Sequence, residues 1–112
     1  MGNILSRRET DMRNQIVLYL LKIGVRPHYK GFNYLINAIA LAFNSNKRIP
    51  MLEIYEIVGN AHNVDAKRVE RCIRTLVGIY CDAHNPSEFR YTNSEFIYLC
   101  AEQMKLQEAK EG

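Results

Sequence analysis

Apolar residues recur every three or four positions along most of the chain, which is the spacing that gathers them on one face of an α-helix. No run alternates apolar and polar residues as a strand would. We therefore predict an all-α fold, a compact bundle of about five to six helices. The expected helices cover residues 6–23, 31–44, 50 to a turn near 63, 65–80, and 92 onward, with a polar tail from about 107.

Several residues in this pattern are chemically suited to helix ends. Side-chain oxygens cap the first free N–H groups of a helix, glycine favours its stop, and proline fits its first position. These signals predict boundaries at Ser6 with Glu9, Gly24, Pro50, Asp65, and Thr92 with Glu95. The segment from Cys81 to Tyr91 is expected to be a loop.

The stretch from Ile54 to Tyr80 fits a helix-turn-helix. Such a motif needs a small residue where two helices approach, a tight turn, and apolar anchors at fixed offsets. Gly59 supplies the small residue, Asn63 tolerates a left-handed turn, and Val64 plugs the corner. Val69, Cys72, Ile73 and Leu76 would anchor the second helix from beneath.

These anchors leave a polar and basic set of side chains pointing outward from the second helix. The candidate DNA-binding residues are Lys67, Arg68, Glu70, Arg71, Arg74 and Thr75. Arginine can read guanine in the major groove, and glutamate can accept a hydrogen bond from cytosine. The alternative is that Glu70 and Arg74 only form a surface ion pair four residues apart.

Charge is divided unevenly along the chain, whose net charge is +3. Residues 1–50 carry eight Lys/Arg and two Asp/Glu, giving +6, and residues 51–112 carry seven and ten, giving −3. A basic region favours a polyanionic partner. Arg26, His28 and Lys30, which precede the second expected helix, are candidate contacts to DNA phosphates. The alternative is a solvated loop.

Other classes of protein find little support. No apolar run is long enough to span a membrane, and the N-terminus does not resemble a signal peptide. Three cysteines without regular spacing indicate a reducing, cytoplasmic location. Cys81 and His84 are a single C-x-x-H pair, whereas structural zinc needs two pairs, so we expect no metal. No phosphate loop or nucleophile motif is present; we expect neither catalysis nor a cofactor.

Several strings together resemble the C-terminal effector domain of the stage-zero sporulation protein A family, the master response regulators of sporulation initiation. The strings are Ile23-Gly24-Val25, His28 to Leu35, Ala38-Ile39-Ala40, Arg68 to Arg74, and Thr92 to Ile97. The resemblance implies an all-helical domain that enters the major groove of a short operator resembling TGTCGAA. Arg68, Glu70, Arg71 and Arg74 match the recognition-helix positions of the family, while Lys67 and Thr75 depart from them.

The resemblance also sets expectations for organisation and partners. We read residues 1–112 as a single helix-turn-helix domain without the phosphoreceiver of the family, a monomer when free that pairs on tandem DNA sites. Double-stranded DNA is the expected partner. Residues 81–91 form a shorter segment than the one by which the family contacts RNA polymerase, and polymerase is a second candidate partner. The alternative function is a helical protein-interaction module or a competitor that occupies operators without activating transcription.

Overall fold

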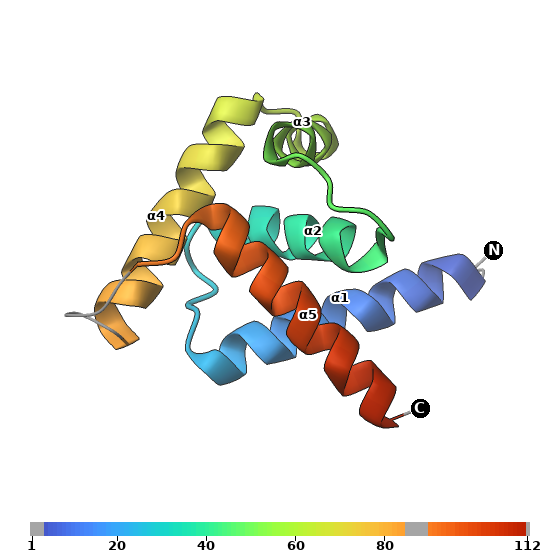
Figure 1. Ribbon diagram of the computed structural model, residues 1–112. Helices are drawn as coiled ribbons and strands as arrows, with labels where there is room; N and C mark the ends of the chain where they lie inside the picture. Colours follow the sequence, from blue (N-terminus) through green and yellow to red (C-terminus); the bar gives the residue numbers. More distant parts are fainter. Residues whose placement is uncertain (1–3, 85–89, 112) are drawn as a thin grey trace.

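Five helices make up the regular structure of the residues that the computed structural model describes, which are 4–84 and 90–111, with side chains described for 10–84 and 90–110. They are α1 (Ile4–Ile23), α2 (Gly31–Asn44), α3 (Met51–His62), α4 (Ala66–His84) and α5 (Asn93–Glu111), shown in Figure 1. These ranges contain no strand. The prediction of an all-α bundle is confirmed.

Helix α2 is the central element of the bundle. Eight of its fourteen residues are buried, and it packs against each of the other four helices. Leu35 and Ile39 of α2 have no exposed surface, and neither do Ile16 of α1, Ile73 of α4 and Ile97 of α5. The helices thus share one core, built on the apolar faces that the three-and-four spacing predicts.

Three predicted helix ends are confirmed, one by its backbone conformation and two by their hydrogen bonds. Gly24 ends α1 with a φ of +98°, a left-handed backbone that glycine adopts at little cost. The Arg68 N–H donates to the Asp65 carboxylate at 2.9 Å, which makes Asp65 the cap of α4. Thr92 and Glu95 form a reciprocal capping box at α5, with N–H to side-chain distances of 2.8 and 3.1 Å.

At two N-termini the boundary is displaced from the prediction. Helix α1 begins at Ile4, before Ser6, and the side chains of Ser6 and Glu9 lie outside those that the structure describes. Pro50 is the residue before α3 rather than its first member. Its carbonyl accepts from the Ile54 N–H at 3.2 Å, so the helix starts at Met51.

Two C-termini extend beyond the prediction. Helix α4 continues past Tyr80 to His84, because Cys81 is buried and keeps the apolar face of the helix in the core. Helix α5 continues to Glu111, so the polar tail predicted from Gln107 is helical. Its last residues are strong helix formers without an intervening glycine or proline, and burial is not required to sustain such a sequence once the helix has begun.

Candidate nucleic-acid interface

The turn between α3 and α4 has the geometry of a helix-turn-helix. A methyl group added at Gly59 would lie 2.5 Å from the backbone oxygen of Val64, so only glycine fits without movement. Asn63 has a left-handed backbone (φ 59°, ψ 43°), and the Val64 N–H donates to the Gly59 carbonyl at 2.9 Å. The Val64 side chain is partly buried against the core, so the roles predicted for these three residues are confirmed.

Helix α4 crosses α3 at a steep angle, as Figure 1 shows, with α3 seen nearly end-on while α4 runs across the view. The inner face of α4 is fixed by five buried residues and the half-buried Cys72. The five are Val69, Ile73, Leu76, Val77 and Cys81. Because this face is held in the core, the opposite face of α4 is presented to solvent in one orientation.

The structure places all six candidate DNA-binding residues on α4. Lys67, Arg68, Arg71, Arg74 and Thr75 are exposed, and Glu70 is half-buried at the edge of the face. Arg74 and Glu70 form an ion pair at 3.3 Å, so the pairing considered as an alternative exists in the free protein. It is a surface pair, since 65% of the Arg74 side chain is exposed. Such pairs contribute little stability and can be exchanged for another acceptor.

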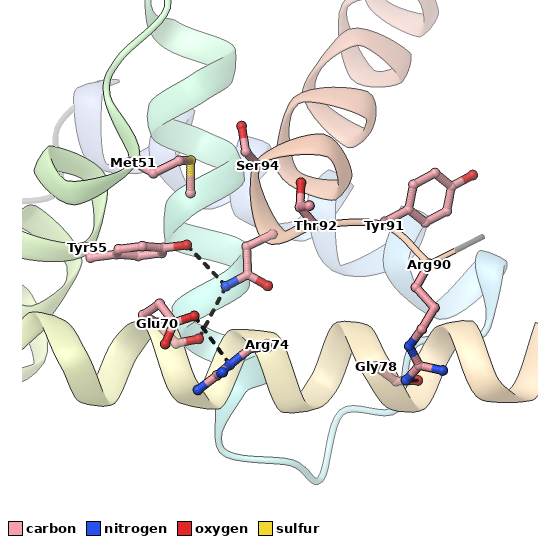
Figure 2. Close-up of a pocket in the computed structure, with 10 residues that line it drawn as sticks. Met51, Tyr55, Glu70, Arg74, Gly78, Arg90, Tyr91, Thr92 and Ser94 are labelled. Carbon is pink, nitrogen blue, oxygen red and sulfur yellow. Dashed lines mark hydrogen bonds and ion pairs between the residues drawn. The ribbon is translucent and has the colours of Figure 1, made fainter.

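Asn93 is a site residue that the sequence analysis missed. Only 8% of it is exposed, and its amide donates to the Tyr55 hydroxyl at 3.1 Å and to the Glu70 backbone carbonyl at 3.2 Å. The amide thus joins α5 to α3 and α4, and Figure 2 shows its two partners, Tyr55 and Glu70, on those helices. Burial raises the pKa of Tyr55, which keeps its phenol neutral. The capping string around Thr92 marked a helix start but gave no sign of this contact.

The N-terminus of α2 lies directly against the backbone of α4. A methyl group at Gly31 would stand 2.4 Å from the Cys72 carbonyl oxygen. This approach places the preceding loop beside α4, with Arg26, His28 and Lys30 all exposed. Lys30, which directly precedes Gly31, is therefore next to the candidate base-reading helix, and Arg26 and His28 lie in the same loop.

A cavity of about 450 Å³ lies between α3, α4 and α5 on the other side of α4. Its lining includes Asn93. Glu70, Arg74 and Arg90 also line it and are labelled in Figure 2. Arg90, which the sequence analysis did not select, pairs with Asp82 and donates to the Gly78 carbonyl at 3.4 Å. The guanidinium lowers the pKa of the Asp82 carboxyl.

Within the described residues, no three His, Cys, Asp or Glu side chains lie close enough together to hold a metal ion. No helix in those ranges is long and apolar enough to cross a membrane.

The comparison with known proteins found one family that covers most of the chain. The family model for the sporulation initiation factor Spo0A C terminal matches residues 16–104. The match contains the whole of α2, α3 and α4, the cap of α5 and every candidate site residue.

Proposed function

The chain belongs to the Spo0A C-terminal family of DNA-binding regulatory domains, and from this premise we propose that it reads a short operator resembling TGTCGAA in the major groove. The recognition helix is α4. Arg71 and Arg74 supply donors for guanine, and Glu70 supplies an acceptor for the amino group of cytosine.

The observation that supports this proposal most strongly is the rigid presentation of a basic helix face. Val69 and Ile73 hold α4 from inside with no exposed surface, while Lys67 and Arg71 project to solvent from the opposite side. Recognition helices contact base edges with their early turns, and these residues lie in the first two turns of α4. A helix whose axis were free to tilt could not place two arginines against particular bases.

The loop before α2 is proposed to contact the DNA backbone. Arg26, His28 and Lys30 carry donors in one exposed loop, whose end at Lys30 is brought to α4 by the close approach of Gly31 to Cys72. Phosphate contacts fix the register of a protein on the duplex without reading its sequence. Their role here would be to position α4 in the groove.

The proposal extends to the effect of the chain on transcription. The connection between α4 and α5 covers only residues 85–92, in the region where the family contacts RNA polymerase. A short connection favours occupancy of the operator without recruitment of polymerase, with two copies side by side on tandem sites gaining affinity through effective concentration. Transcription in vitro that falls as the operator fills would support this role, and stimulation by the chain would contradict it.

The proposed DNA reading is tested by fluorescence anisotropy on two duplexes of equal length and composition. One carries the TGTCGAA-like operator and the other a scrambled order of the same bases. Because each wrong base pair costs about 1–3 kcal/mol, we expect the scrambled duplex to bind more than about tenfold more weakly. Equal affinities would contradict sequence-specific reading. Absence of binding to either duplex would favour the protein-interaction module instead.

A further inference from the structure

We propose that Arg48, in the loop between α2 and α3, binds a phosphate of the DNA backbone on the side of α4 opposite to Lys30. The inference rests on the proposed function, and it assigns a second contact to the same duplex. It concerns a residue that lies outside the recognition helix and outside the basic loop that precedes α2.

Arg48 is held in place by two contacts with α5. Its guanidinium carbon lies 4.1 Å from the centre of the Tyr98 ring, a cation–π contact. Its Nη2 donates to the Ser94 hydroxyl oxygen at 2.7 Å. The Tyr98 hydroxyl is in turn tied to the backbone of Ile49, accepting from the N–H at 2.8 Å and donating to the carbonyl at 3.0 Å. The loop that carries Arg48 is thus fastened to the first turns of α5.

The charge of Arg48 is not neutralised within the part of the chain that the structure describes. No ion pair there includes Arg48. Arg74 and Arg90, which line the same cavity as Ser94, are by contrast paired with Glu70 and Asp82. A guanidinium has five N–H donors, and stacking on a ring leaves most of them available. Ser94 accepts from Arg48, so its own O–H remains able to donate to the same ligand. A preformed cation beside a hydroxyl donor suits a phosphate.

The position of this pair relative to α4 selects DNA as the source of the phosphate. Ser94 lines the same cavity as Glu70 and Arg74, on one side of α4. The α2 N-terminus meets the other side, at Cys72, and these positions are nearly opposite around a helix. In Figure 2 the loop before α2 passes below α4, while Ser94 lies above it.

A helix in the major groove has a phosphate backbone on each side, because the groove is only about 12 Å wide. Lys30 stands on one side of α4, and Arg48 with Ser94 stands on the other. Arg48 therefore adjoins the proposed interface, and its positive charge is complementary to the phosphates of the second DNA strand. An acidic segment of a partner protein is the competing occupant, and the salt dependence of DNA binding distinguishes the two.

The test measures the salt dependence of binding for the full chain and two charge-matched variants. Arg48→Gln removes the proposed contact. Lys105→Gln is the control and removes one positive charge from α5, where Lys105 pairs with Glu102 at 3.7 Å. Each phosphate contact contributes about 0.9 to the slope of log affinity against log salt. We expect Arg48→Gln to flatten the slope by about one on both operator and scrambled duplexes, and Lys105→Gln to leave it unchanged.

A scan of single methylphosphonate substitutions, which neutralise one phosphate at a time, then locates the contact. One substitution outside the operator bases should weaken the wild-type protein and leave Arg48→Gln unaffected. Arg48→Lys, which keeps the charge, should retain the slope. Melting followed by circular dichroism checks that each variant is folded.

Specific binding by the wild type with an unchanged slope for folded Arg48→Gln would overturn the inference and leave the proposed function standing. That result would turn attention to a protein partner for Arg48. Failure of the wild type to bind either duplex would overturn both. Loss of operator affinity alone, with an unchanged slope, would also overturn it, since Arg48 would then act only through the packing of α5.

Discussion

Asn93 and Tyr55 are joined by a buried hydrogen bond of 3.1 Å, although 38 residues separate them in the sequence. The same amide donates to the backbone carbonyl of Glu70 at 3.2 Å, within the first turns of α4. One side chain therefore fixes how α3, α4 and α5 meet, and it does so directly behind the residues proposed to read DNA.

We expect Asn93→Ala to lower the free energy of unfolding by about 1–3 kcal/mol, because it removes a buried donor and leaves the Tyr55 hydroxyl without this partner. Operator affinity should fall more than affinity for scrambled DNA, since the direction of α4 is less constrained. Chemical denaturation and anisotropy measure the two effects. Tyr55→Phe, which removes only one acceptor, is the milder control. A variant as stable as the wild type would show that the amide does not hold the junction.

The second prediction concerns base reading by α4. Arg71→Ala and Arg74→Ala should each cost about 1–3 kcal/mol in binding the operator and distinctly less on scrambled DNA. Arg74 must first leave Glu70, but that pair is exposed and contributes little. Lys105→Ala on α5 is the control for lost charge. Equal losses on the two duplexes would assign these arginines to phosphates rather than bases.

The third prediction concerns the loop before α2. Lys30→Ala should weaken binding to all sequences alike and flatten the salt slope by about one, as expected for a single phosphate contact. Lys22→Ala, an exposed lysine near the end of α1, should leave the slope as it is. If both variants behave like the wild type, Lys30 lies away from the DNA and the loop is only solvated.

The fourth prediction uses three glycines that differ in their surroundings. Gly59→Ala would place a methyl group 2.5 Å from a backbone oxygen, and Gly31→Ala would place one 2.4 Å from another. Overpacking of this kind costs about 1–3 kcal/mol. Gly78→Ala meets only the flexible end of Arg90, at 3.3 Å, and should be neutral or gain up to about 1 kcal/mol from helix propensity. In thermal melts, Gly59→Ala and Gly31→Ala should lower the melting temperature, and Gly78→Ala should leave it unchanged or raise it slightly.

The fifth prediction concerns thiol reactivity. Burial raises the pKa of Cys100 to about 12, so its thiol stays protonated at neutral pH and is a poor nucleophile. Cys81 is equally inaccessible, with 1% exposed, while Cys72 is half-buried beside Gly31. A disulfide reagent at pH 8 should modify only Cys72 quickly in the native protein and all three cysteines in denaturant. Rapid native modification of two or more would contradict the packing of α4 and α5.

Much of the helix-turn-helix was predictable because its signals are local. Gly59, Asn63 and Asp65 each act on neighbours within six residues, so their chemistry can be recognised in the sequence. The exposed face of α4 followed from the spacing of its apolar anchors. The family strings supported the same assignment independently, from segments spread along most of the chain.

The contacts that join distant segments were not predictable from the sequence. Nothing in the capping string around Asn93 pointed to Tyr55, and Gly31 was read as a helix start rather than as a point of contact with Cys72. Cys81 was expected to begin a loop, but it is buried in the core and α4 continues to His84. Arg48 lies in no recognisable motif, because the contacts that hold its guanidinium come from Ser94 and Tyr98 of another helix.

The packing of α2 against the other four helices has a consequence for how small a working DNA reader can be made from this chain. Helices α3 and α4 alone would expose Ile54, Val58, Ile73 and Leu76, which are buried in the bundle. A two-helix fragment has no second layer to cover them and would not hold the crossing that presents the arginines. The DNA-reading face of α4 cannot be excised or grafted as a two-helix module, because α2 supplies the core that holds α3 and α4 in place.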